Sequence, residues 1–230
     1  MSFIVKNTTF ISLLDLLAPH SCRGCGRLGE ALCECCKNNI ISAEISICPN
    51  CKNKTKNHIC EECKNLPPIY YLGERSDLLA KLIHDFKYNS TRAIGIKFAE
   101  ILNETLPKSL PESAILIPLP TSTKHIRERG FDHTFLIAKH LAKLRHYKLH
   151  KLLLRAKNTV QVGTDKKTRI KQADAAYELN PKIKIEPKAT YILLDDVWTT
   201  GASMKSAIKK LRQAGAKHLI VIILAVNRLN

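Results

Sequence analysis

The sequence predicts an α/β protein, with a parallel sheet flanked by helices and a small N-terminal cysteine-rich module. After residue 67, segments with a helical spacing of apolar residues alternate with short apolar runs, which is the pattern of a parallel sheet. Two of these runs, 191–194 and 218–226, lack alternation, as strands covered on both faces do. All nine cysteines precede residue 66. We therefore divide the chain into modules 1–66 and 67–230, with a hinge at Leu66–Pro68.

The elements of the larger module are predicted from its periodicity. Helices are expected around 78–86 and 94–102, where apolar residues recur every three or four positions. Another helix is expected after Lys124, with a shared apolar side made of Phe131, Phe135, Ala138, Leu141 and Ala142. A further helix begins near Met204 and stops at Gly215. Strands are expected at 114–117, 149–154, 189–194 and 218–226.

The composition is strongly basic, with 37 Lys and Arg against 20 Asp and Glu and a formal charge of +17. This excess predicts attraction to polyanions, of which nucleic acid and an anionic membrane surface are the candidates. No apolar run reaches the roughly 20 residues that span a bilayer, which excludes an integral membrane protein. The first residues lack the basic cluster of a secretory signal, and Asp15 interrupts their apolar stretch. We therefore expect a cytoplasmic protein.

The segment Phe10–Leu17 predicts a short amphipathic helix. Packing against the rest of the chain is the default expectation. In so basic a chain the helix can instead lie in an anionic membrane interface, which would associate the protein with the cytoplasmic face. A helix this short binds weakly unless anionic lipid assists.

Eight cysteines form four Cys-x-x-Cys pairs, and this arrangement predicts structural zinc. Two thiolates separated by two residues turn back on one ion, and a second such pair completes the tetrahedron. Seven residues separate the first two pairs and eight separate the last two, so we expect two sequential sites. The pairs are Cys22/Cys25, Cys33/Cys36, Cys48/Cys51 and Cys60/Cys63.

Cysteine spacing leaves other arrangements open. A single ion, or pairs interleaved across the segment, fits the same residues. A redox centre is the other functional alternative, although redox pairs normally stand alone beside a strand–helix unit. Cys35 is the odd thiol. His58 is a spare ligand candidate, but an ordinary surface histidine is the more frequent case.

The segment 191–203 combines a buried strand, two carboxylates and a loop of small residues. The strand runs into Asp195 and Asp196, whose carboxylates can accept hydrogen bonds from vicinal hydroxyls near a divalent cation. The loop Thr199–Ser203 precedes a helix, whose N-terminal amides and dipole favour a phosphate. Gly201 lets the backbone approach closely. Together these features predict a site for a phosphorylated ribose.

The same segment resembles the phosphoribosyl pyrophosphate (PRPP) signature of type I phosphoribosyltransferases, in which a strand, two acids and a Thr-Thr-Gly-x-Ser/Thr loop follow one another. The resemblance implies a type I phosphoribosyltransferase-like fold and a site for PRPP with Mg²⁺. It assigns PRPP binding to Asp195, Asp196, Thr199, Thr200, Gly201, Ala202 and Ser203. It assigns pyrophosphate binding to the loop after strand 114–117, with Pro120, Thr121, Ser122 and Lys124.

Over nearly its whole length the chain is similar to the ComF family, bacterial proteins related to competence protein F that join a zinc ribbon to a phosphoribosyltransferase-like domain. Besides the cysteine pairs, the similarity is carried by Leu82-Ile-His-Asp-Phe-Lys87-Tyr88, Arg127-x-Arg129-Gly130-Phe131, Leu153-Leu-Arg155, Gln161 with Arg169, and the run from Leu193 to Gly201. After Arg-Gly-Phe the family pattern has Asn-Gln, whereas this chain has Asp132-His133. The resemblance implies a role in natural transformation, on single-stranded DNA and beside other competence and recombination proteins.

The charge of the chain agrees with that implication. Two basic loops on either side of a phosphate site can follow a sugar–phosphate backbone without reading its sequence. These loops lead into residues 127–132 and cover residues 155–171. The nucleic-acid contacts expected there are Arg127, Arg129, Lys166, Lys167 and Arg169.

Two functions are open from the sequence. The favoured one is a DNA-handling protein that binds PRPP or a related phosphoribosyl group as a ligand. The other is an active phosphoribosyltransferase acting on a nucleobase or a nucleic-acid-linked acceptor, with metal neutralisation and positioning supplying most of the rate. The complete phosphate loop supports an enzyme, whereas the lack of an evident nucleobase hood after strand 218–226 speaks against one, unless the zinc module serves instead. No catalytic residue is assigned.

Overall fold

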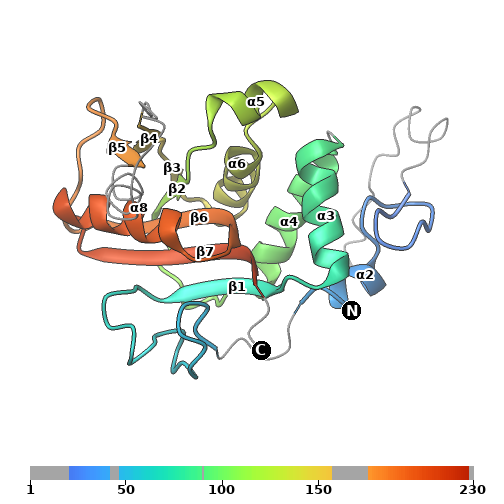
Figure 1. Ribbon diagram of the computed structural model, residues 1–230, viewed down its shortest axis with the longest axis horizontal. Coiled ribbons are helices and arrows are strands. Elements are labelled where there is room, and N and C mark those ends of the chain that lie inside the picture. The colour runs from blue at the N-terminus through green and yellow to red at the C-terminus, as the bar shows by residue number, and fades with distance from the viewer. Residues whose placement is uncertain (1–20, 42–46, 90, 157–175, 228–230) are drawn as a thin grey trace, which may run out of the picture.

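A computed structural model describes residues 21–41, 47–89, 91–156 and 176–227. Their centre is a five-stranded parallel sheet of order β1-β7-β6-β2-β3 (Figure 1). The strands are β1 (Ile69–Glu74), β2 (Ile115–Pro118), β3 (Lys148–Leu149), β6 (Thr190–Trp198) and β7 (His218–Val226). A separate antiparallel pair joins β4 (Leu153–Arg155) to β5 (Tyr177–Leu179). The predicted α/β class with a parallel sheet is confirmed.

Helices cover both faces of the sheet (Figure 1). One face, here called the α3 face, packs against α3 (Asp77–Tyr88), α4 (Arg92–Thr105) and α6 (His133–Arg145). The other, here called the α8 face, packs against α8 (Ala202–Gln213) and the β4–β5 pair. Two shorter helices are α2 (Glu34–Asn38) and α5 (Thr123–Arg129). Among the described residues, no helix is long and apolar enough to cross a membrane.

Strand alternation divides the core into these two layers. Ile192 and Leu194 of β6 belong to the α3-face cluster, whereas Tyr191 and Leu193 belong to the α8-face cluster. All four side chains are at most 1% exposed. The unalternated apolar run therefore forms a strand buried on both sides, as predicted.

The carboxyl ends of β2 and β6 lie next to each other. Pro118 is paired with Leu194, and the Leu119 amide donates to the Leu194 carbonyl at 2.9 Å. The loop after β2 and the loop after β6 therefore leave the same edge of the sheet. This is where ligands bind in open α/β sheets.

Two predicted elements are each divided in the structure. The expected strand 149–154 becomes β3, which pairs with β2, and β4, which pairs with β5 instead of the parallel sheet. The expected helix after Lys124 becomes α5 and α6. Gly130 ends α5 with a left-handed φ of 73°, and Asp132 starts α6 by accepting a hydrogen bond from the Phe135 amide.

Some predictions fall on other parts of the chain, and one strand was not predicted. The helix expected at Phe10–Leu17 lies outside the described residues, as do Gln161, Lys166, Lys167 and Arg169 of the basic loop. Strand β1 was missed because its apolar run is short and follows directly on the presumed hinge. The module boundary at residue 66 stays a prediction.

Candidate functional site

The paired cysteines gather into two four-sulfur groups, and the pairs combine sequentially as expected. Within each group all Sγ atoms lie within 4.8 Å of one another. Tetrahedral zinc with a Zn–S bond of about 2.3 Å needs sulfur atoms about 3.8 Å apart. The Cys25–Cys33 and Cys51–Cys60 separations are 3.6 and 3.4 Å. The first group is Cys22, Cys25, Cys33 and Cys36, and the second is Cys48, Cys51, Cys60 and Cys63.

The chemistry of these sulfurs suits a cation. Burial raises the pKa of the Cys36 and Cys48 thiols to about 12. A buried thiolate is therefore unfavourable unless a positive ion compensates its charge, which zinc does. Cys35 is exposed and outside both groups. His58 is outside them as well, and its ring lies 4.2 Å from that of Tyr70. Each group can hold zinc with its four sulfurs alone.

The first cysteine group is part of the α3-face core. Cys22, Cys33 and Cys36 are at most 8% exposed and belong to its hydrophobic cluster. A Cβ added at Gly24 would lie 2.5 Å from the Cys36 sulfur, so this turn requires glycine. Lys37 of α2 forms ion pairs with Glu34 at 2.9 Å and with Glu104 of α4 at 2.7 Å. The first group is therefore attached to the larger module through α4.

The second cysteine group lies beside β1 and α8. The Tyr71 hydroxyl of β1 donates to the Ile47 carbonyl at 3.0 Å, and Arg212 of α8 donates to the Asn65 carbonyl at 2.7 Å. Within the group, the Asn50 amide donates to the Cys63 sulfur at 3.1 Å. None of its cysteines belongs to either of the two core clusters. This group is therefore attached from outside, through polar contacts.

The two acids at the end of β6 project to opposite faces of the sheet, because neighbouring residues of a strand alternate. Asp196 lies on the α3 face and is 6% exposed. Its Oδ2 is 2.5 Å from the Lys87 Nζ of α3 and 2.8 Å from the His133 Nε2 of α6. Burial alone would raise the pKa of Asp196. The His133 hydrogen bond and the Lys87 charge outweigh burial and hold that pKa well below its ordinary value.

Arg129 extends this cluster and fixes the tautomer of His133. The Arg129 guanidinium lies 3.0 Å from His133 Nδ1, and since arginine can only donate, Nδ1 accepts and Nε2 carries the proton given to Asp196. The guanidinium also lies 5.0 Å from the centre of the Tyr88 ring and donates to its hydroxyl at 3.3 Å. Asp196 is thus held by a chain of side chains from three helices.

Asp195 has the opposite environment on the α8 face. Burial and the neighbouring Asp196 charge raise the pKa of Asp195 to about 8. The Asp196 amide donates to its Oδ1 at 2.9 Å, and the Arg155 charge partly offsets the rise. At neutral pH, Asp195 is mostly protonated and Asp196 is ionised.

A pocket of about 220 Å³ opens at this edge of the sheet and brings many of the predicted residues together. Asp195, Asp196 and Ser203 line it from β6 and the start of α8, and Pro120, Thr121 and Ser122 line it from the loop after β2. Basic and aromatic side chains complete its wall: Lys87, His125, Arg129, His133, Arg155 and Tyr177. The loops expected to converge do so in their described parts.

The predicted phosphate loop adjoins this pocket. Thr199, Thr200, Gly201 and Ala202 surround a small hollow of about 50 Å³, which shares Asp195 and Ser203 with the pocket. Gly201 has a φ of 71°, and a Cβ there would lie 2.2 Å from the Trp198 ring. Trp198 is 2% exposed and packs under the loop. The Ala202 amide donates to the Thr200 hydroxyl at 3.3 Å.

The loop after β2 is held by hydrogen bonds of its own. The Thr121 hydroxyl donates to Asp132 at 3.0 Å, and Ser122 caps α5 by accepting from the His125 amide at 3.3 Å. Lys124 and Arg127 are exposed on α5 and do not line the pocket. The pyrophosphate and nucleic-acid roles of these residues stay predictions.

Curated relatives match most of the chain, although no protein-family model does. Competence protein F of Haemophilus influenzae is 28% identical, with 87% of this chain and 93% of that protein covered. Competence proteins ComFC of Bacillus subtilis and Streptococcus pneumoniae are 25% and 24% identical, covering 81% and 92% of this chain and 80% and 90% of their own lengths. These similarities support the predicted resemblance to the ComF family.

The likeness to solved structures is slighter. A hypoxanthine phosphoribosyltransferase from Staphylococcus aureus has 12% identity and a TM-score of 0.30, with 60% of this chain and 63% of that chain covered. This likeness is too slight to carry an argument. The ComF assignment rests on the three competence proteins. The predicted fold, a parallel sheet flanked by helices with a zinc-ribbon-like cysteine module, is borne out by the described residues.

In this chain, the departure from the ComF family's Asn-Gln has a structural role. Asp132 caps α6 and anchors Thr121, and His133 contacts Asp196. Sequence reasoning gave no role to His133, Lys87, His125 or Tyr177. For Lys87 a signal was present, since it belongs to one of the fragments shared with the family. Tyr177 follows the basic loop and carried no signal.

Proposed function

We propose that this chain is a competence-related protein of natural transformation that binds single-stranded DNA and holds PRPP with Mg²⁺ in the pocket between β2 and β6. The resemblance to the ComF family supports the competence role, since all three relatives are named competence proteins. The high positive charge of the chain supports the binding of single-stranded DNA. We also propose that the chain has other competence proteins as partners. It would make a peripheral contact with anionic membrane at the cytoplasmic face.

The PRPP assignment is carried by unsatisfied donors around the pocket and its hollow. Among the described residues, Arg129 Nε and Trp198 Nε1 are buried without a hydrogen-bond partner. Arg129 lines the pocket and Trp198 lines the hollow under the phosphate loop. A buried donor without a partner is costly. An anionic group in each place would satisfy these donors, and PRPP carries such groups at both ends.

Different residues of the pocket and the loop would bind different parts of PRPP. Ser203 and the loop 199–202 would hold the 5′-phosphate, with the Ala202 amide exchanging the Thr200 hydroxyl for a phosphate oxygen. Asp195 would accept from the ribose hydroxyls, while Asp196 is already committed to Lys87 and His133. Lys87, Arg129 and Arg155 would attract the pyrophosphate. Mg²⁺ would neutralise that pyrophosphate when bound.

Zinc is proposed as the structural ion of both cysteine groups. All eight ligands are sulfur, the atoms are within coordinating distance of one another, and the cysteine segment carries little apolar core of its own. Metal binding would therefore supply much of its folding free energy. Elemental analysis of the purified chain should find two zinc ions per chain. A folded protein without metal would contradict this assignment.

The experiment for PRPP is titration calorimetry with Mg²⁺ and PRPP. Wild-type protein should bind, and Gly201→Ala should weaken binding by tenfold or more, because its new methyl group collides with Trp198 beneath the loop. Lys143→Ala, on the exposed side of α6, is the control. If the wild-type protein releases no heat and shows no protection of the loop from proteolysis, the site is not a PRPP site.

The alternative is an active phosphoribosyltransferase, in which an acceptor nitrogen bonds to the anomeric carbon while the bond to pyrophosphate breaks. Asp195, mostly protonated at neutral pH, favours ligand binding over general base catalysis in the free protein. Pyrophosphate release with nucleobases and with single-stranded DNA as acceptors separates the two. Sustained release would make this chain an enzyme and reverse our ranking.

A further inference from the structure

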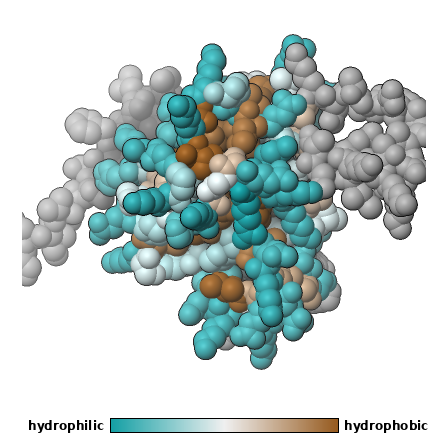
Figure 2. All heavy atoms as spheres, turned by 90° about the vertical axis from the view of Figure 1, so that its left-hand side faces the viewer, coloured by the Kyte–Doolittle hydropathy of each residue, from teal (hydrophilic) through white to brown (hydrophobic). Residues whose placement is uncertain are grey.

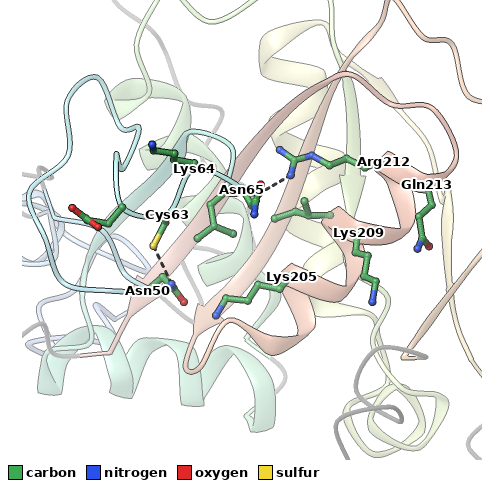
Figure 3. A pocket seen from close by; sticks show the side chains of 11 residues that line it. Asn50, Cys63, Lys64, Asn65, Lys205, Lys209, Arg212 and Gln213 are labelled. Carbon is green, nitrogen blue, oxygen red and sulfur yellow. Dashed lines mark hydrogen bonds between the residues drawn. The ribbon is translucent and has the colours of Figure 1, made fainter.

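A second and larger cavity lies between the second cysteine group and α8. Its volume is about 820 Å³, against about 220 Å³ for the pocket at β2 and β6. Figure 3 shows Asn50, Cys63, Lys64 and Asn65 on one wall and Lys205, Lys209, Arg212 and Gln213 of α8 on the other. We call this space the α8 groove. Figure 2 shows that this side of the molecule is mostly hydrophilic, with hydrophobic residues in separate small areas.

The α8 groove is strongly basic. Lys64, Lys205, Lys209 and Arg212 face a single carboxylate, Glu62. The three cations of α8 recur about once per helical turn on its exposed side, along roughly 10 Å of the axis. The apolar positions of the same helix, Met204, Ala207 and Leu211, are buried against the sheet. A row of cations in a groove fits a repeating anion better than a single one.

One side chain, that of Lys205, connects the groove with the phosphate loop. Lys205 stands at the start of α8 and its Nζ donates to the Thr200 carbonyl, at 3.4 Å. A strand with one phosphate at the loop would therefore meet Lys205 next, and Lys209 a turn later. Among the described lining residues no side chain is aromatic. The groove therefore offers charge and amide hydrogen bonds, but no surface on which bases stack.

We propose that the α8 groove binds the phosphodiester backbone of single-stranded nucleic acid. This inference rests on the proposed DNA binding. It locates the bound DNA on a surface that the sequence did not indicate. The second cysteine group forms one wall, so a metal bound by its sulfurs would hold that wall in place. Arg212 ties α8 to the Asn65 carbonyl and is a structural contact, whereas Lys205 and Lys209 are exposed and line the groove, with Lys205 extending toward the side of Asn50 in Figure 3.

The test is anisotropy of a fluorescent oligothymidylate with the full chain, as salt rises from about 50 to 200 mM. The variant is Lys205→Gln with Lys209→Gln. The matched control is Lys139→Gln with Lys143→Gln, which removes two exposed lysines at the same spacing from α6. The groove variant should lower affinity about tenfold at the lowest salt and reduce the slope of log affinity against log salt by about 1.4, since each contact adds about 0.7.

Each outcome decides something different. Wild-type protein that does not bind the oligonucleotide refutes the proposed function itself. Wild-type binding with a groove variant that behaves like the α6 control refutes only the groove. Oligoglutamate of equal charge that competes as well as DNA assigns the groove to an acidic protein segment instead.

Lysine acylation read by mass spectrometry locates the bound oligonucleotide without any variant. The oligonucleotide should protect Lys205 and Lys209 of the wild-type chain several-fold and leave Lys139 unprotected. Equal protection of all three lysines would contradict the inference. Unchanged thermal unfolding of both variants shows that lost binding is not lost structure.

Discussion

The two faces of the central sheet carry the same kinds of residues in different environments. Each face has one cysteine group and one acid of the Asp195–Asp196 pair beside it. On the α3 face the cysteines are built into the hydrophobic core, and Asp196 is ionised between Lys87 and His133. On the α8 face the cysteines attach through polar contacts, and Asp195 stays protonated at the pocket between β2 and β6. Burial and charge pairing integrate the acid and the cysteines of the α3 face, whereas the α8 face has a protonated acid and the α8 groove beside its cysteines.

The largest expected effect separates the two cysteine groups. Cys36→Ser should remove the first zinc and lower the melting temperature by at least about 10 °C, because it opens the α3-face core and 1 kcal/mol corresponds to about 2–4 °C in a chain of this size. Cys63→Ser should remove only the second zinc, with a smaller loss. Calorimetric melting together with zinc content checks both. Equal losses in the two variants would mean that the groups are equally integrated.

A smaller difference is expected between the acids. Asp196→Asn should cost about 3–5 kcal/mol of unfolding free energy, since it removes the buried carboxylate that pairs with the half-buried Lys87 ammonium and with His133. Asp195→Asn should cost no stability and should stabilise the chain at neutral pH, because the protonated acid and the amide are both neutral but only the wild type must take up a proton on folding. Urea unfolding at neutral pH measures both.

The double variant Lys87→Met with Asp196→Asn is the control for this comparison. Removing both charges should recover part of the loss, because neither charge is then left uncompensated. If the double variant is as unstable as the sum of the single ones, the pair does not interact in the folded chain.

Local patterns in the sequence were sufficient for much of the fold. The unalternated runs of β6 and β7, the periodicity of α3, α4 and α8, and the sequential cysteine groups depend on neighbouring residues, and they were predicted. The division of 149–154 was not, because the partner of Leu153–Arg155 is the distant strand Tyr177–Leu179. An apolar run of strand length does not specify which strand it joins.

The candidate site divides in the same way. Asp195, Asp196 and Ser203 were found because a contiguous motif carries them. Lys87 and His133 were not, since their importance lies in a contact between α3, α6 and β6 that no local spacing encodes. One signal was available and unused: adjacent acids in a strand project to opposite faces, so two equivalent roles for them were never compatible with β6.

Another expected effect is a pH dependence that belongs to one face. The folded chain raises the pKa of Asp195 from 3.8 to about 8, so between these values folding takes up a proton and stability falls as pH rises. Above pH 8 the destabilisation is complete and no longer changes. Asp196 has a lowered pKa, and its stabilisation is lost only in acid below 3.8. Asp195→Asn should therefore gain stability relative to wild type between pH 5 and 8, as measured by urea midpoints. A constant difference across that range would mean that Asp195 is ionised throughout, and that both faces hold their acids in the same state.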